Sequence, residues 1–235
     1  MKKSCKALHC ASLTYCRDSI MKIPGEDTMS SLSGYIRNIF GGTGYEMIEV
    51  KSTVDGRSYK VRKLPDSQEA ANLLAKLRIR LQTLMDILEQ KFPSKPQVIR
   101  LKKNFVPDPR RFLESTPDAK HTSYSVNKGE SVHFCLRQRN GNEQLVDENV
   151  MTFVALHEMA HMATESIGHD ADFWNNFAWL LARAEENNLY KYTDFKAHPV
   201  LYCGVTITDS PKYDPAKDNE KKAANDFTVG KMFSF

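Results

Sequence analysis

Three histidines lie within the segment HEMAHMATESIGHD, residues 157–170, of a chain that has only 7 histidines in 235 residues. His157 and His161 are four residues apart in a segment that we expect to be helical, so their imidazoles lie on one helix face about a turn apart. Imidazole nitrogens bind Zn²⁺ at about 2.0–2.1 Å, and two ligands at this spacing reach one ion. The pattern His-Glu-x-x-His therefore predicts a zinc site.

Glu158, directly after the first histidine, is the candidate catalytic residue. Its carboxylate can take a proton from a water that the metal activates and later deliver that proton to a leaving amine. In a chain of this composition the pattern would arise by chance with a probability of roughly one in a hundred. The alternative interpretation is that the histidines are exposed on a surface helix and bind no metal, but the apolar flanking residues favour the metal site.

A catalytic zinc takes three protein ligands and leaves one position open, so a third ligand is expected. We predict His169, because Gly168 can end the helix in a left-handed turn that aims the next side chain back at the ion. Glu165 is one alternative, although a continuing helix would carry it about 6 Å beyond the second histidine. Glu185 or Glu186, on the following helix, are the others.

Other polar residues near this motif have two possible roles. Asp170 or Asp172 could orient a ligand imidazole, although capping the next helix is the more ordinary role for either. A hydrogen-bond donor could stabilise the oxyanion that forms when water attacks a peptide carbonyl, whereas packing is the ordinary role of such side chains. The candidate donors are Tyr190, Tyr192, Tyr202 and His198.

Upstream of the motif, the sequence predicts a β-hairpin over residues 45–63, because apolar and polar residues alternate on either side of Asp55-Gly56. An amphipathic helix is predicted over residues 67–91, where leucines recur every three or four positions. QVIRL, residues 97–101, is a candidate strand, and a proline-containing loop is expected after it.

The motif itself lies between further predicted elements. Residues 123–137 favour a strand or hairpin with a turn at Asn127-Lys128-Gly129. The motif helix is expected to run from a capping Asp147 to Gly168. A second helix should follow over residues 170–190, and a short strand is expected within residues 198–209.

The composition is that of a globular protein, with 41% hydrophobic and 26% charged residues. We expect one domain over residues 45–210, between a poorly ordered segment at 1–44 and a polar tail at 211–235 that is partly disordered. No apolar run is long enough to cross a membrane, and the N-terminus makes no convincing signal peptide, so we predict an intracellular protein that is not secreted. Reduced thiols are expected for all five cysteines, namely Cys5, Cys10, Cys16, Cys135 and Cys203.

Charge is distributed unevenly along the chain. Residues 51–120 contain 16 Lys/Arg against 8 Asp/Glu, whereas residues 121–235 contain 11 against 16. A basic region upstream of a hydrolytic site could attract a polyanion such as nucleic acid. Solvated helix faces would produce the same count, so both interpretations stay open.

The segment HEMAHMATESIGHDADFW, after the strand-like GESVHFCLR and before a Trp/Leu-rich helix, resembles the WLM and SprT-like zinc peptidases. It is most similar to the WLM-like metallopeptidases of large DNA viruses, over about residues 45–210. The resemblance implies that His157, His161 and His169 bind Zn²⁺ and that Glu158 is the catalytic base. It also implies an α+β, minimal zincin-like fold with a small, mostly antiparallel sheet, flanking helices and a strand near 131–137 beside the substrate cleft.

One spacing departs from the family pattern. Two more residues separate His161 from His169 than in His-x-x-Gly-x-x-His, so the turn that presents the third ligand must differ. The leading hypothesis is a zinc metalloendopeptidase acting on proteins or peptides, some of which could be bound to nucleic acid. The alternatives are a DNA-associated binding protein, or a structural zinc protein whose fourth ligand is Cys203 or Glu185.

Overall fold

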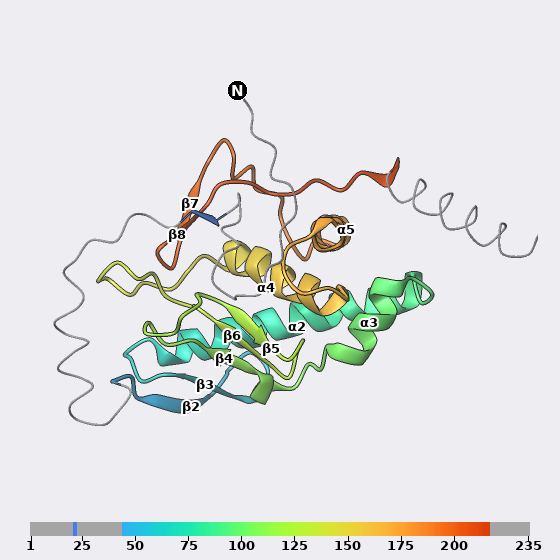
Figure 1. Ribbon diagram of the computed structural model, residues 1–235. Helices are drawn as coiled ribbons and strands as arrows, with labels where there is room; N and C mark the ends of the chain where they lie inside the picture. Colours follow the sequence, from blue (N-terminus) through green and yellow to red (C-terminus); the bar gives the residue numbers. More distant parts are fainter. Residues whose placement is uncertain (1–20, 23–43, 217–235) are drawn as a thin grey trace, which may run out of the picture.

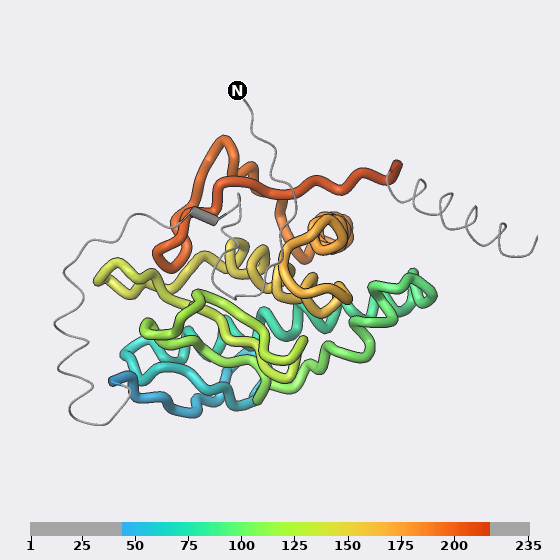
Figure 2. The backbone as a smooth tube through the Cα atoms, viewed as in Figure 1, coloured from blue at the N-terminus to red at the C-terminus, as the bar shows by residue number. Residues whose placement is uncertain are grey.

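The computed structural model describes residues 21–22 and 44–216 (Figures 1 and 2). The expected disorder of residues 1–44 and 211–235 therefore falls mostly outside the described residues, as do Cys5, Cys10 and Cys16. Nothing in the described part tests those predictions.

The architecture is α+β, as expected, with two sheets. The larger sheet has the strand order β2-β3-β4-β6-β5 and mixes two antiparallel with two parallel pairings. The smaller sheet, β1-β8-β7, is antiparallel throughout. The strands are β1 (Met21–Lys22), β2 (Met47–Lys51), β3 (Ser58–Arg62), β4 (Phe112–Glu114), β5 (Tyr124–Val126), β6 (Ser131–Phe134), β7 (Val200–Tyr202) and β8 (Val205–Ile207).

The predicted hairpins are present. Strands β2 and β3 form the first, and Gly56 adopts the positive φ of 69° that its turn requires. Strands β5 and β6 form the second, around the predicted turn at residues 127–129. The single short strand expected within 198–209 is instead two strands, β7 and β8, joined at Cys203-Gly204, where both residues have positive φ.

Strand β4 lies where the sequence predicts a loop. It is only three residues long and follows a 3-10 turn, η1 (Pro109–Arg111). Phe112 and Glu114 are buried, and the strand pairs in parallel with both β3 and β6. A run this short carries no periodicity, so only the neighbouring strands define it.

Four helices complete the described fold: α2 (Ser67–Lys91), α3 (Pro96–Asn104), α4 (Glu148–Ala163) and α5 (Ala171–Glu186). The predicted helix over residues 67–91 is confirmed by α2. The strand predicted at 97–101 is wrong, because that segment lies in α3. Pro96 begins this helix with a suitable φ, and Val98 and Leu101 bury one face at a spacing of three residues.

Helix α4 is the centre of the molecule. It lies between the larger sheet and a layer formed by α5 and the β7–β8 hairpin, while α2 and α3 pack against its other sides (Figure 1). Thirteen of its 16 residues are buried, and the apolar ones belong to the core. A helix buried on all sides needs an apolar surface all round, so polar residues within it require a specific reason.

The helix begins where the sequence predicts and ends earlier. The Asp147 side chain accepts hydrogen bonds from the backbone N–H groups of Asn149 and Val150, as an N-cap does. Its last residue is Ala163, although the helix was expected to continue to Gly168. Thr164 is already extended, because side chains from α3 and the β5–β6 turn bind the carbonyls at this end.

A disulfide joins Cys135, just after β6, to Cys203 in the β7–β8 turn. The prediction of reduced thiols is wrong for this pair. The two cysteines are 68 residues apart in the chain, so their proximity follows from the packing of the hairpin against the larger sheet and not from any local pattern.

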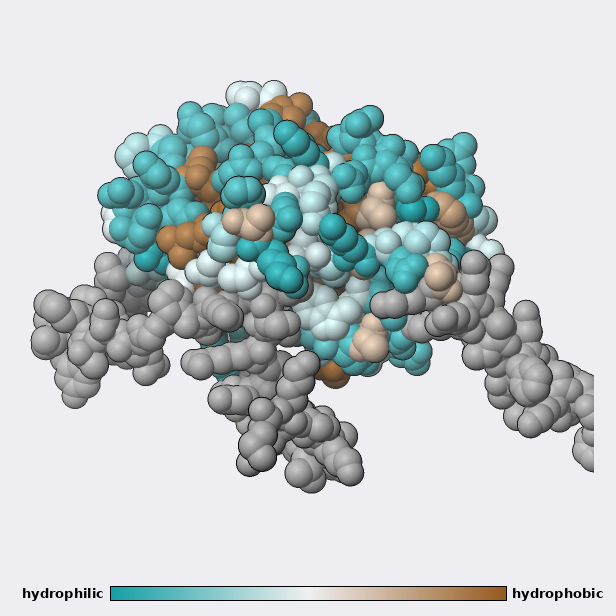
Figure 3. All heavy atoms as spheres, turned by 90° about the horizontal axis from the view of Figure 1, so that it is seen from above, coloured by the Kyte–Doolittle hydropathy of each residue, from teal (hydrophilic) through white to brown (hydrophobic). Residues whose placement is uncertain are grey.

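The surface seen in Figure 3 is mostly hydrophilic, with apolar side chains in separate small patches. Over residues 21–22 and 44–216, none of the helices combines the length and the apolar character needed to cross a lipid bilayer.

We expect Gly129→Ala to lower the free energy of unfolding by about 3 kcal/mol, because Gly129 has φ 112° and an added Cβ would overlap the Asn104 carbonyl oxygen. Gly141→Ala is the control, since Gly141 has φ 81° but nothing within 4 Å of an added Cβ, so about 1 kcal/mol is expected. Urea unfolding measures both. Equal losses would show that the turn does not need this close approach.

Candidate metal centre

The three predicted histidines converge at the end of α4. Their ring centroids are 5.0 Å apart for His157–His161, 5.0 Å for His157–His169 and 4.7 Å for His161–His169. One nitrogen from each ring lies within 4.8 Å of the others. In the described part of the chain, this is the group of histidine, cysteine and acidic residues that can hold a metal ion.

The geometry fits a small divalent cation. Two nitrogens bound tetrahedrally to zinc at 2.0–2.1 Å are about 3.4 Å apart. The Nε2 atoms of His157 and His169 face each other at 3.1 Å, close to that separation. Two imidazoles gain little from such an approach unless a proton or a cation lies between them, so the arrangement favours a shared ion.

Burial also gives His157 the correct protonation state. The residue is only 9% exposed, and desolvation lowers its pKa well below the ordinary value, with a further contribution from the positive charges that His161 and His169 would carry. A neutral imidazole has the lone pair that a metal ligand must supply.

The segment after α4 brings His169 back to the other two histidines. Arg100 Nε donates to the Ala163 carbonyl at 2.6 Å, Asn104 Nδ2 to that of Met162 at 2.9 Å, and Lys128 Nζ to that of Thr164 at 2.7 Å. These donors satisfy the terminal carbonyls that a longer helix would have used. Gly168 then reverses the chain at φ 96°, as its predicted left-handed turn requires.

The alternative third ligands lie elsewhere. Glu165, Glu185 and Glu186 are exposed, and none belongs to the metal-binding group. Glu185 borders a pocket beside Asp147, at the opposite end of α4. His157 is ten residues further along this helix, or about 15 Å along its axis, which is too far for Glu185 to share an ion with it.

Asp170 caps the following helix. Its side chain accepts a hydrogen bond from the Phe173 backbone N–H at 2.9 Å and begins α5 directly after His169. Asp172 lies in the first turn of α5, where a negative charge interacts favourably with the helix dipole. Asp170 thus has the capping role that was the more ordinary expectation, and Asp172 follows it in the first turn.

Aromatic side chains of α5 enclose the three imidazoles. The Phe173 ring centroid lies 4.9, 4.4 and 4.4 Å from those of His157, His161 and His169. Trp174 stacks beside His169 at 5.7 Å. Helical periodicity by itself predicts only that these aromatics belong to an amphipathic helix. Their position directly after the third histidine was the available signal.

Glu158 lies in the interior with its carboxyl group at the edge of the larger sheet. It is 5% exposed, and burial raises its pKa to about 8, while the Ser125 backbone N–H donates a hydrogen bond that opposes the shift. Ser125 is in β5, the edge strand, whereas β6 lies inside the sheet. The strand that contacts Glu158 is therefore β5, and the predicted strand near 131–137, β6, is the next strand inward; which of them borders the substrate stays a prediction. No pattern in the sequence around Ser125 predicts its hydrogen bond to Glu158.

Of the candidate hydrogen-bond donors, Tyr202 lies near Glu158. The phenol is fully buried, and burial together with the nearby Glu158 charge raises its pKa. Tyr190 packs against the Phe153 ring, and Lys212 lies over the ring of Tyr192. His198, the fourth candidate, is exposed.

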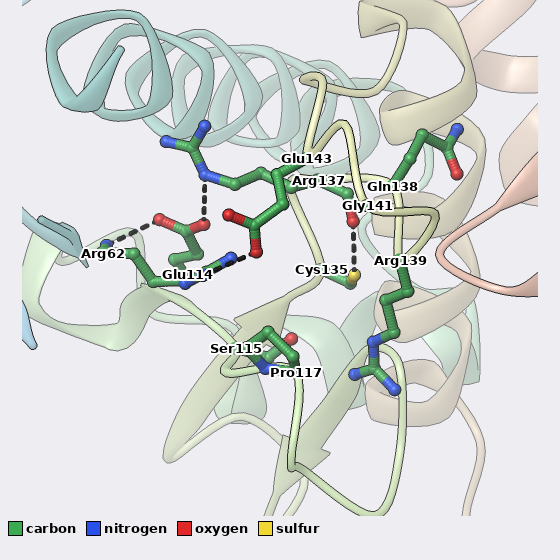
Figure 4. A pocket seen from close by; sticks show the side chains of 10 residues that line it. All are labelled: Arg62, Glu114, Ser115, Pro117, Cys135, Arg137, Gln138, Arg139, Gly141 and Glu143. Carbon is green, nitrogen blue, oxygen red and sulfur yellow. Dashed lines mark hydrogen bonds and ion pairs between the residues drawn. The ribbon is translucent and has the colours of Figure 1, made fainter. Parts of the chain in front are cut away.

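A separate polar cavity of about 240 Å³ lies beside the segment that follows β6. None of the candidate site residues lines it (Figure 4). Arg137 pairs there with Glu114 at 2.9 Å, and Arg62 pairs with Glu143 at 2.7 Å. These ion pairs hold the segment between β6 and α4 in place.

We expect His169→Ala to weaken zinc binding by more than about 100-fold, because it removes one of three converging nitrogens. Glu185→Ala, which changes an exposed acid outside this group, should leave affinity unchanged. Zinc content after dialysis and titration against a chelator measure both. Loss of zinc in the Glu185 variant alone would contradict this assignment.

Comparison with known proteins agrees with the geometry. The WLM domain family model matches residues 54–232. An uncharacterized protein of Acanthamoeba polyphaga mimivirus is 35% identical over 170 residues, which cover 71% of this chain and 85% of that protein. An uncharacterized protein of Invertebrate iridescent virus 6 is 33% identical over 82 residues, or 34% of this chain and 44% of that protein.

Among solved structures, the crystal structure of Wss1 from Saccharomyces cerevisiae is similar, with a TM-score of 0.38 and 19% identity over 55% of this chain and 89% of that chain. The family of this chain is shown by the family model, which matches most of its residues, and by the mimivirus relative. The chain belongs to the WLM domain family.

Proposed function

We propose that this chain is a zinc-dependent metalloendopeptidase that hydrolyses peptide bonds in protein or peptide substrates. The observation that carries the proposal is the convergence of three imidazoles beside a carboxyl group on the same buried helix. Membership in a family of zinc metalloproteases supports it.

Zinc, when bound, supplies a Lewis acid that polarises a carbonyl group and makes water more acidic. The chain supplies the rest of the chemistry. His157, His161 and His169 would hold the ion, and Glu158 would accept a proton from the attacking water and pass it to the leaving amine. Burial raises the Glu158 pKa to about 8, toward the range in which a carboxyl group can both accept and donate a proton.

The edge strand supports an extended peptide as substrate. Strand β5 pairs with β6 on one side, and its other side ends the sheet beside Glu158. An unpaired strand edge accepts a further strand through backbone hydrogen bonds, which recognise any peptide sequence. Because the Ser125 N–H already donates to Glu158, a peptide added along the rest of that edge would pass beside this carboxyl group.

A structural zinc site has less support. It needs a fourth protein ligand, and the metal-binding group in the described residues consists of three histidines. Of the two candidates for a fourth ligand, Cys203 is bonded to Cys135 and Glu185 is exposed at the end of α5.

Glu158→Gln should retain zinc and lower kcat/KM for a generic unfolded protein by about 100- to 10,000-fold, because an amide cannot accept the proton. Glu165→Gln is the control, since Glu165 is exposed in the loop between the second and third histidines. Metal content and cleavage rate are measured on the same preparations. Activity of the Glu158 variant equal to that of the control would refute the assigned role.

We further propose that some substrates are bound to nucleic acid, on the basis of the charge excess in residues 51–120. Part of that excess is neutralised within the fold: Arg78 pairs with Asp55, and Arg80 with Glu148. Exposed cations remain on α3, where Lys102 and Lys103 form the last turn. These lysines are among the exposed cations that a phosphate backbone could bind, and Lys102 would exchange its partner Glu89, 3.5 Å away, for a phosphate.

Replacing both Lys102 and Lys103 by Gln should weaken binding to a DNA oligonucleotide. The slope of log affinity against log salt concentration should become shallower by the amount that about two phosphate contacts contribute. The control replaces Lys191 and Lys196, which are exposed in the acidic half of the chain. Fluorescence anisotropy over a range of salt concentrations measures both. Absent binding at low salt, or affinity that salt does not change, would refute the nucleic-acid proposal and leave the peptidase proposal intact.

A further inference from the structure

The β7–β8 hairpin is attached to the larger sheet and the segment after it by a disulfide and by hydrogen bonds of Leu201, Tyr202 and Cys203. Its turn residue Cys203 is joined to Cys135 at the end of β6. The Cys203 N–H donates to the Gln138 side-chain oxygen at 2.9 Å, and the Gln138 amide donates back to the Leu201 carbonyl at 2.8 Å. Both sulfurs belong to buried residues, with Cys135 at 4% exposure and Cys203 at 1%.

Tyr202, next to this cysteine, connects the hairpin to the edge strand. Its hydroxyl lies 2.5 Å from Ser123 Oγ, and that oxygen also accepts the Cys135 N–H at 3.0 Å. Ser123 directly precedes β5, two residues before Ser125, whose N–H donates to the Glu158 carboxyl group. A continuous path of bonds therefore runs from the disulfide to the carboxyl group on α4.

We propose that the Cys135–Cys203 disulfide, acting through Tyr202 and Ser123, is a redox-sensitive positioning element that holds β5 against Glu158. Tyr202 is accordingly a positioning residue and not a catalytic one. This inference rests on the proposed peptidase function for its effect on rate, although its effect on β5 does not.

The hairpin depends on this attachment. Strands β7 and β8 have three residues each, and β1 adds only two residue pairs on the other side of β8, so this small sheet needs attachment to the rest of the fold. Cys203 has φ 50°, an unfavourable conformation for a residue other than glycine, which persists only when surrounding bonds impose it. Removing the cross-link therefore frees the turn to relax, and the adjacent Tyr202 hydroxyl moves with it.

Reduction is a two-electron step. A phosphine attacks the disulfide, the sulfur–sulfur bond breaks, and water supplies one proton to each sulfur and its oxygen to the phosphine. The products are two thiols and a phosphine oxide. A cellular dithiol would achieve the same reduction by becoming a disulfide itself.

The metal ligands lie outside this path. His157 and His161 are on α4, and the segment leading to His169 is held by Arg100 and Lys128 from α3 and the β5–β6 turn. Reduction should therefore slow the chemical step without releasing zinc. This separates a positioning effect from general loss of the site.

The first experiment counts free thiols in the denatured full-length protein. The chain has five cysteines, so the bonded pair predicts three free thiols before phosphine treatment and five afterwards. Finding five before treatment would overturn the proposal.

The second experiment compares oxidised and phosphine-reduced protein by hydrogen exchange, zinc content and peptide cleavage. We expect faster exchange at residues 123–126 and 200–207 on reduction, unchanged exchange in α2, unchanged zinc, and a decrease of about 10-fold in kcat with little change in KM. Equal exchange in the two states would overturn the proposal. Faster exchange without cleavage in either state would support the positioning element and refute the peptidase function instead.

Matched variants separate the hydroxyl from the disulfide. Tyr202→Phe removes only the hydroxyl and should reproduce the loss of kcat in the oxidised protein, whereas Tyr192→Phe should not. Cys203→Ser should be insensitive to phosphine, whereas Cys16→Ser should respond as the unchanged protein does. Full activity in both the Tyr202 and Cys203 variants would overturn the proposal.

Discussion

The structure depends on the burial of two ionisable side chains in a helix that has no solvent-exposed face. His157 and Glu158 are 9% and 5% exposed, and each loses the hydration that would stabilise its charge. Burial makes the imidazole neutral and raises the carboxyl pKa to about 8. Burying such groups lowers the stability of the fold unless a partner interacts with them. A divalent cation shared by three imidazoles is the partner that this arrangement fits.

The other elements then serve to hold that helix and its surroundings. Side chains from α3 and the β5–β6 turn end α4 early, which brings His169 back beside the first two histidines. Phe173 covers the three rings from α5, and Ser125 provides the hydrogen bond to Glu158 from the sheet edge. The smaller sheet holds that edge through Tyr202. A site assembled from so many elements requires the complete fold.

The parts that could be predicted are those with a local cause. The helix over 67–91 has a long apolar periodicity, and Gly168 has the positive φ that its turn required. The predictions that proved wrong concern segments whose structure is decided by contacts with distant residues and not by the local sequence pattern. The run at 97–101 is compatible with a strand or a buried helix face, and Pro96 together with packing on α4 made it helical. Likewise, the length of α4 was set by cations from other elements, which no local pattern shows.

By itself, the sequence determined that two imidazoles and a carboxylate share one helical turn, because side chains four residues apart on a helix lie together whatever surrounds them. Only the tertiary structure decided that His169 completes the group, that Ser125 faces Glu158, and that Cys135 and Cys203 form a disulfide. The physical reason is distance along the chain: these contacts join segments whose proximity results from packing the whole core, and packing energy is not encoded in any short stretch of residues.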